Sequence, residues 1–235
     1  MKIVSYAICP FVQRVTALLE AKNITYDIAY IKLSDKPQWF LDISPTEQVP
    51  ILVTEDGDAL FESEAIVEYI DEVTPPLNAG ASPTQRAKDR AWSYQASKHY
   101  LTQCSAMQSP NKATLVERGE KLSAAFGRAE KHLGEGPYFN GINVGNVDIA
   151  WLPLLHRAQI IKERSGYDFL AEFPKTRAWQ TAIADTGIPR RSVAEDFEQR
   201  FADFYLSEYT FLGRGVDIVD AQSCSGNRAS GSCCG

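Results

Sequence analysis

The chain has 235 residues, of which 44% are hydrophobic and 23% charged, a composition typical of a folded globular protein rather than a disordered one. Its formal net charge is −6 and it contains no long basic run, which argues against a nucleic-acid partner and against binding to an anionic membrane. No stretch approaches about 18 consecutive apolar residues, so the sequence predicts no membrane-spanning helix.

Residues 1–76 predict an α/β domain built on a four-stranded sheet. Alternating β-prone segments mark the strands, and apolar residues at helical spacing mark the helices. The strands are expected at 2–8, 25–33, 49–53 and 58–62, and the helices at 10–24, 36–43 and 63–73. Pro10 suits a helix start, where its missing N–H costs nothing, and Ser63 is expected to cap the third helix.

The rest of the chain predicts an all-helical domain. Residues 73–83 are rich in Pro, Gly, Ala and Ser and show no periodicity, which is typical of a linker. The helical domain is expected over 83–212, with helices at 84–107, 112–133, 147–163, 174–185 and 192–211. Residues 213–235 are small and polar and predict a flexible tail.

Charge and cysteine usage are both uneven along the chain. Residues 1–76 carry 5 Lys/Arg and 13 Asp/Glu, a net charge of −8, whereas the remainder carries +2, which supports two compositional halves. Three of the five cysteines, Cys224, Cys233 and Cys234, lie in the tail. A secreted disulfide framework would spread an even number of cysteines through the fold, so the sequence indicates a reducing, cytoplasmic compartment. The tail thiols could bind a soft metalloid or resolve a disulfide, and an inert tail is the alternative.

Cys9 stands between the first predicted strand and a helix that begins at Pro10. A sulfur at a helix N-terminus meets unpaired N–H groups and the positive end of the helix dipole, which both favour the thiolate. The pKa of a free thiol is ~8.5, and in such sites it falls to about 3.5–7.5. The alternative is a small buried residue that closes the strand. Val12 occupies the position of a second cysteine in a C-x-x-C pair, so a reactive Cys9 needs an external thiol to release a mixed disulfide.

Four segments of the first half resemble the cytosolic glutathione transferase family: ICPFVQR, LSDKPQWF, EQVPILV and LFESEAIVEYIDE. The Cys-Pro-Phe and Lys-Pro-x-Trp-Phe elements are most similar to the omega class, which uses a cysteine, and to its bacterial relatives. In the helical half the similar segments are GNVDIAWLPLLHR and FPKTRAW. The resemblance implies a thioredoxin-like N-terminal domain, an all-α C-terminal domain and glutathione as cosubstrate.

The resemblance also implies roles for single residues around the sulfur. Cys9 would be the catalytic thiol that faces the glutathione sulfur. Val49 would pair through its backbone with the cysteinyl part of glutathione, and Pro50 would be a cis-proline that presents it. From the residues alone, an ordinary trans proline at a strand start is the expected alternative, because cis X–Pro bonds are only ~5–6% of such bonds.

Further glutathione-binding residues follow from the same resemblance. Glu62 and Ser63 match the pair that holds the γ-glutamyl end, where a helix start can bind a carboxylate and Glu62 can meet an ammonium group. Lys36 matches the position that pairs with the glycyl carboxylate, and Phe11 belongs to the same set. The alternatives are a simple helix cap at residues 62–63 and a solvated charge at Lys36.

The helical domain is expected to supply the substrate pocket. In the family, the helix DRAWSYQASKHYLTQC walls the electrophile site, which implies contacts from Tyr94, Ser97, His99 and Tyr100. Aromatic residues at helical spacing are equally typical of a core. The three histidines show no metal-ligand spacing, so no metal site is predicted.

These observations lead to one functional hypothesis and two alternatives. Cys9 occupies the position at which many glutathione transferases carry a Tyr or Ser hydroxyl, which favours thiol exchange. The hypothesis is a glutathione-dependent thiol transferase or reductase that forms a mixed disulfide at Cys9, and the resemblance implies small disulfides, dehydroascorbate and glutathionyl-ketones as substrates. The alternatives are conjugation or dehalogenation of electrophiles, and a non-catalytic binding or regulatory protein of the same fold. The family further implies a homodimer.

Overall fold

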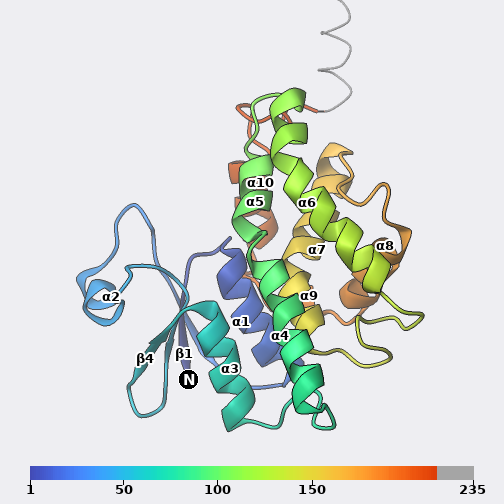
Figure 1. Cartoon of the computed structure of the whole chain (residues 1–235). Coiled ribbons are helices and arrows are strands. Elements are labelled where there is room, and N and C mark those ends of the chain that lie inside the picture. The colour runs from blue at the N-terminus through green and yellow to red at the C-terminus, as the bar shows by residue number, and fades with distance from the viewer. Residues whose placement is uncertain (216–235) are drawn as a thin grey trace, which may run out of the picture.

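A four-stranded sheet organises the first part of the chain (Figure 1). The computed structural model describes residues 1–215. The first elements are β1 (Lys2–Ser5), α1 (Pro10–Ala21), β2 (Asp27–Tyr30), α2 (Gln38–Ile43), β3 (Ile51–Val53), β4 (Ala59–Phe61) and α3 (Ser63–Val73). The strand order is β2-β1-β3-β4, with β1 parallel to β2 and antiparallel to β3. The α/β architecture expected from the sequence is therefore confirmed.

The strand register brings three segments of the chain to one end of the sheet. Val4 pairs with Ile51, and Ile51 pairs with Phe61 on the opposite side. Strand β1 therefore ends where β3 begins and where β4 ends. The loop after Ser5, the residue before Ile51 and the residues after Phe61 consequently lie together at that end.

The strands are shorter than the sequence predicts. β1 stops at Ser5 instead of residue 8 because the chain turns there, and the Cys9 amide donates to the Tyr6 carbonyl at 3.0 Å. β2 is likewise limited to Asp27–Tyr30, at the edge of the sheet. The predicted hairpin is confirmed: the Thr54 amide donates to the Asp58 carbonyl at 2.9 Å across a turn in which Gly57 has φ +91°.

The remaining described elements are helices, and they form the body at the right of Figure 1. They are α4 (Pro83–Ser97), α5 (Tyr100–Met107), α6 (Lys112–His132), α7 (Asn146–Ser165), α8 (Pro174–Asp185), α9 (Ile188–Arg191) and α10 (Phe197–Tyr205). None of the helices within residues 1–215 has the length and apolar character needed to cross a membrane. The predicted tail lies outside the described residues from position 216 onward, together with its three cysteines.

Two predicted helices are corrected by the structure. The helix expected at 84–107 is broken into α4 and α5, because a ring nitrogen of His99 lies 2.6 Å from the Gln95 carbonyl and the His99 amide turns to Ala96 instead. The helix expected at 192–211 is only α10, because the Thr210 hydroxyl donates to the carbonyl of Tyr205 at 2.9 Å and ends the helix there. In both places, a side chain competes with the backbone for a carbonyl oxygen.

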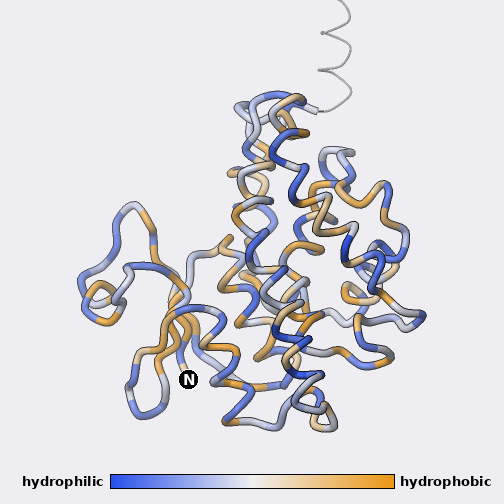
Figure 2. Tube along the Cα trace, in the orientation of Figure 1, coloured by the Kyte–Doolittle hydropathy of each residue, from blue (hydrophilic) through white to orange (hydrophobic). Residues whose placement is uncertain are grey.

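Helix α1 lies between the sheet and the helical body and is buried along most of its length. Hydrophobic segments, orange in Figure 2, run through the strands and the inner helices. Polar side chains of α1 also cross to the helical body. Gln13 Nε2 lies 2.8 Å from His156 Nδ1, and Thr16 Oγ1 donates to the Ser192 carbonyl at 2.7 Å. Burial and the neighbouring Arg157 lower the pKa of His156 to about 3, so its ring is neutral and Nδ1 accepts from Gln13.

One buried carboxylate holds the loop before α7. Asp148 is 1% exposed and accepts from the amides of Phe139 at 2.9 Å and Gly145 at 2.8 Å, and from the indole of Trp179 at 2.6 Å. All three donors are therefore satisfied by a single side chain, which ties α7 to α8 and to the preceding loop.

We expect Asp148→Ala to lower the free energy of unfolding by about 3 kcal/mol, because it leaves two buried donors, on Phe139 and Trp179, and the partly buried Gly145 amide without a partner. Urea unfolding followed by circular dichroism measures the change. Glu120→Ala, at an exposed position of α6, serves as the control and should leave the stability within about 0.5 kcal/mol. Equal stability of the two variants would contradict this account of the loop.

Candidate active site

Cys9 lies at the N-terminus of α1, as predicted. It is the N-cap residue, with φ −74° and ψ 124°, and Pro10 is the first residue of the helix. Its thiol is free, and the residue as a whole is partly exposed. The β1–α1 loop places Cys9 at the end of the sheet where β3 begins and β4 ends.

The pKa of the Cys9 thiol is raised, so the prediction of a depressed pKa is wrong. Burial is the largest influence, because the sulfur is densely surrounded although part of the residue reaches the surface. The amides of Val12 and Phe11 and the charge of Arg157 lower the pKa but do not overcome burial, and Cys104 raises it further. The helix N-terminus therefore lowers the free energy needed to ionise Cys9, but this effect is smaller than that of burial, and the thiol stays protonated at neutral pH.

Arg157 supports the loop in front of Cys9, and sequence reasoning missed it. It is fully buried in α7 and donates to the carbonyls of Ile8 and Pro153, each at 3.1 Å, and to the side chain of Gln13. Its guanidinium also lies 5.4 Å from the ring centre of Phe197. A single arginine within the apolar run WLPLLHRAQII was the signal that could have identified it.

The Val49–Pro50 peptide bond is cis, as the family resemblance implies. Pro50 is buried and immediately precedes β3, so the carbonyl and amide of Val49 lie at the same end of the sheet as the Cys9 loop. This position allows the Val49 backbone to pair with an extended ligand laid beside the strand.

Glu62 and Ser63 form the junction between β4 and α3. Glu62 is the N-cap residue, with φ +66°, and Ser63 is the first residue of the helix, so the prediction that Ser63 caps α3 is wrong. Such a positive φ is uncommon outside glycine, and it turns the chain sharply from strand to helix. The free amides of the first helical turn are therefore placed beside Pro50 and Cys9.

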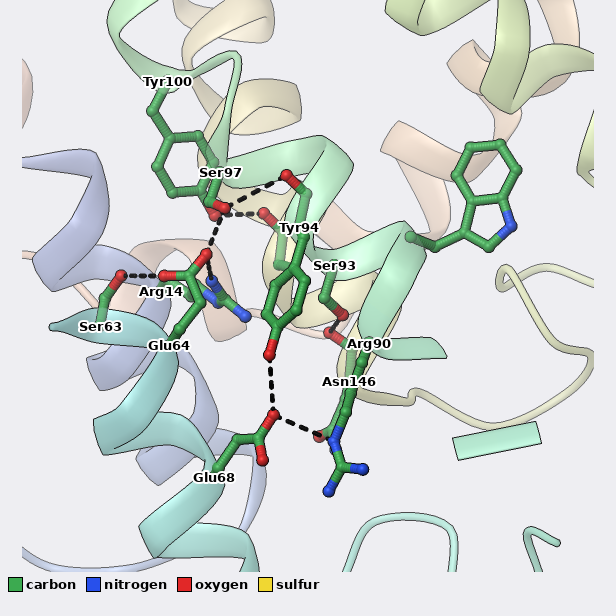
Figure 3. Close-up of polar contacts among 12 residues, drawn as sticks. Arg14, Ser63, Glu64, Glu68, Arg90, Ser93, Tyr94, Ser97, Tyr100 and Asn146 are labelled. Carbon is green, nitrogen blue, oxygen red and sulfur yellow. Dashed lines mark hydrogen bonds and ion pairs between the residues drawn. The ribbon is translucent and has the colours of Figure 1, made fainter. Parts of the chain in front are cut away.

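Glu64 lies next to Ser63 and gathers three helices around its carboxylate (Figure 3). Its Oε2 accepts from the Ser63 hydroxyl at 2.9 Å, and its Oε1 pairs with Arg14 Nη1 of α1 at 2.8 Å and accepts from Ser97 of α4. Sequence reasoning missed both Arg14 and Glu64. The available signal was Arg14 itself, a charge between Val12 and Val15 on the apolar face of α1.

The other predicted glutathione contacts are placed as follows. Lys36 lies in the loop before α2, and its Nζ is 3.6 Å from Glu47 Oε2. Phe11 packs edge-to-face on Tyr100, with ring centres 5.1 Å apart. Lys36 is therefore half-buried and paired with an exposed carboxylate, and Phe11 forms part of the wall between α1 and α5.

The four predicted pocket residues do not gather into one wall. Tyr94 faces α3, where its hydroxyl donates to Glu68 at 3.1 Å. The Ser97 hydroxyl donates to Glu64. His99 lies between α4 and α5, and its ring is bound to the Gln95 carbonyl of α4. Tyr100 is fully buried and donates to the Ala150 carbonyl, so it offers no surface to a ligand in this structure.

Two hollows open between the sheet-bearing part and the helices. One, of about 1150 Å³, begins at Tyr6 and Ala7 beside the Cys9 loop and runs along β2 to residues 191–200. The other, of about 550 Å³, lies between α3 and α4 and is lined by Arg14 and Tyr94 among others. Within residues 1–215, no group of three or more His, Cys, Asp or Glu side chains is arranged to hold a metal ion.

Comparisons with known proteins bear on the family to which this fold belongs. Two family models match, the glutathione S-transferase N-terminal domain at residues 8–73 and the glutathione S-transferase C-terminal domain at residues 109–193. The crystal structure of glutathione transferase Omega 3C from Trametes versicolor superposes with a TM-score of 0.71 and 28% identity, over 83% of this chain and 89% of that one.

Curated relatives give the same result at the level of sequence. The probable glutathione S-transferase DHAR1, cytosolic, of Oryza sativa subsp. japonica is 30% identical over 177 residues, which cover 74% of this chain and 79% of that protein. Glutathione S-transferase omega-1 of Sus scrofa is 26% identical over 88% of this chain and 86% of that protein. The chain therefore belongs to the glutathione S-transferase family and has relatives among its omega and DHAR members.

Proposed function

We propose that the chain is a glutathione-dependent thiol transferase or reductase that works through Cys9. The observation that carries the proposal is a free, partly exposed cysteine at the N-cap of α1, at the same end of the sheet as cis-Pro50 and the start of α3. Relatives named omega-1 and DHAR1 support the assignment.

Glutathione would lie across this end of the sheet. Its cysteinyl part pairs with the backbone of Val49, and its α-carboxylate meets the amides at the start of α3 and the Ser63 hydroxyl. Glu62 takes the α-ammonium group, and Lys36 takes the glycyl carboxylate. In this placement, the glutathione sulfur faces Cys9.

The reaction would proceed by two thiol–disulfide exchanges. The Cys9 thiol loses its proton to solvent, and its thiolate attacks the glutathione sulfur of a mixed disulfide, which breaks that S–S bond and releases the substrate as a thiolate. A second glutathione thiolate then attacks the Cys9–glutathione disulfide. Cys9 is restored as a thiolate, and the two glutathione molecules leave as glutathione disulfide, so the substrate gains two electrons and glutathione supplies them.

A non-catalytic binding protein of the same fold is the second candidate, and the raised pKa of Cys9 favours it. A mostly protonated thiol is a slow nucleophile near neutral pH. The enzymatic proposal therefore requires that bound glutathione is presented close enough to Cys9 for exchange to proceed from a small thiolate fraction. Turnover of a glutathionylated substrate distinguishes the two candidates.

We also propose a homodimer and a cytoplasmic location. The family resemblance supports the dimer, and exposed apolar residues on β4 and α5, Phe61 and Leu101, provide surface that a partner could cover. The rice relative is named cytosolic, which supports the location.

Cys9→Ser should lower the glutathione-dependent reduction of a small disulfide at least about a hundredfold, because the serine hydroxyl cannot form the mixed disulfide. Glutathione binding, measured by calorimetry, should persist. Cys104→Ser, which replaces the other described cysteine, is the matched control: it removes a group that raises the pKa of Cys9, so it should keep or increase the activity. Full disulfide reduction by the Cys9 variant would rule out the mechanism.

Alkylation of Cys9 in the ligand-free protein should accelerate as the pH rises, with a midpoint above the ~8.5 of an ordinary thiol. The reason is that burial raises the thiol pKa, so the reactive thiolate becomes abundant only at alkaline pH. The rate is read by mass spectrometry on the peptide that contains Cys9, after iodoacetamide treatment between pH 6 and 10. A rate that is already maximal at pH 7 would contradict the assigned direction of the shift.

Light scattering during gel filtration should give twice the chain mass of 26.1 kDa. Phe61→Glu and Leu101→Glu together should shift the protein toward monomer, because each places a charge on the surface that a partner would cover. A wild-type protein that is monomeric throughout the micromolar range would refute the proposed dimer.

A further inference from the structure

The hydroxyl of Ser63 is already engaged by a side chain of the same helix. Ser63 Oγ lies 2.9 Å from Glu64 Oε2, and a dashed line marks this contact in Figure 3. An ionised carboxylate carries no proton and only accepts hydrogen bonds, so Ser63 must be the donor. The single proton of the Ser63 hydroxyl is therefore donated to Glu64 in this structure.

The Glu64 carboxylate is fixed in place by groups from two other helices. Arg14 of α1, whose side chain is 3% exposed, makes an ion pair with Glu64 Oε1, and Ser97 of α4 donates to the same oxygen. These donors, together with Ser63, hold the pKa of Glu64 below its usual range although burial acts in the opposite direction. Glu64 is thus a charged acceptor at neutral pH.

Arg14 depends on Glu64 for its neutralisation. Its Nε has no hydrogen-bond partner among residues 1–215, and its ion pair with Glu64 is the contact that balances its buried charge. Without the carboxylate, the uncompensated positive charge of Arg14 would lie beside residue 64, the second residue of α3. Such a charge attracts a bound carboxylate.

We propose that Glu64 is an internal competitor for the α-carboxylate of glutathione, which holds the Ser63 hydroxyl until the ligand displaces it. This inference rests on the proposed function, in which that carboxylate binds Ser63 and the first amides of α3. Glu64 then lowers the affinity for glutathione in two ways. It accepts the hydrogen bond that the Ser63 hydroxyl would otherwise donate to the ligand, and it neutralises the charge of Arg14 that would otherwise attract the ligand carboxylate. It also offers Ser63 a partner at the moment of release, which favours the departure of glutathione and its disulfide.

The exchange needs no movement of a helix. When Ser63 turns its hydroxyl toward the ligand, Oε2 of Glu64 loses one donor, while Oε1 keeps Arg14 and Ser97. Only the side chain of Ser63 rotates. Glu64 acts on the ligand through Ser63 and Arg14 and is therefore a positioning residue, not a catalytic one.

The helix itself offers a matched control one turn farther on. Glu68 is held in the same manner, by the Tyr94 hydroxyl at 3.1 Å and by Arg90 Nε at 3.0 Å, and neither partner belongs to the junction of β4 and α3 (Figure 3). Glu68→Gln removes a comparable charge from α3 and leaves Ser63 untouched. It should leave the Kd for glutathione unchanged within about twofold.

Calorimetric titration with reduced glutathione tests the proposal. In Glu64→Gln, the Kd should fall about tenfold, because the Ser63 proton is released and Arg14 is left without its anion. Glu64→Asp keeps the charge near Arg14 but draws it away from Ser63, so its Kd should fall about threefold. In the Ser63→Ala background, the gain from Glu64→Gln should shrink, since no hydroxyl remains to be released.

The sign of the change separates this proposal from a purely structural role. A variant that only damages the fold binds glutathione more weakly, whereas a removed competitor tightens binding and lowers the KM for glutathione. Unchanged or weaker binding in both Glu64 variants, with a wild-type protein that binds glutathione, would overturn the inference alone. A wild-type protein that does not bind glutathione would overturn the proposed function and the inference with it.

Discussion

The burial of polar side chains on α1 is the constraint on which the rest of the structure depends. Gln13, Arg14 and Thr16 are each at most 3% exposed, so each must find its partner inside the protein. Thr16 donates a hydrogen bond to the Ser192 carbonyl. Gln13 is hydrogen-bonded to His156 and Arg157. Arg14 forms an ion pair with Glu64. These partners belong to the helical body and to α3, so the two halves are joined through one helix.

The same helix determines where the chemistry occurs. Cys9 is the N-cap of α1, and the loop in front of it is held by Arg157 through the Ile8 carbonyl. The sheet register then brings Pro50 and the start of α3 to the same end. A helix that is fixed on all sides presents the thiol rigidly. The packing that fixes the helix also buries the sulfur, and this burial raises the thiol pKa.

Much of this arrangement could be predicted from the sequence. The alternating strands, the Pro10 helix start and the hairpin at Gly57 are local patterns, and local interactions decide them. Cys9 and the cis bond at Pro50 followed from short motifs and a family resemblance. The predicted helix ends were wrong where a side chain binds a carbonyl that the helix backbone would otherwise use, as His99 does at the break between α4 and α5.

The pKa of Cys9 and the network around Glu64 could not be predicted from the sequence, for a physical reason. A helix N-terminus is visible in the sequence, whereas the packing that desolvates the sulfur comes from several elements distant in the chain. Likewise, Arg14, Glu64 and Ser97 are 50, 33 and 83 residues apart in sequence, and only the tertiary fold makes them partners. Buried charges in apolar runs, such as Arg14 and Arg157, were the visible signs of such contacts.

A crystal structure of the full chain grown with glutathione disulfide tests the central claim most directly. The account predicts a disulfide bond between Cys9 and one glutathione, with the peptide beside Val49 and its γ-glutamyl end at Ser63. Glutathione bound elsewhere, or a Cys9 thiol that remains free while glutathione occupies the site, would contradict it.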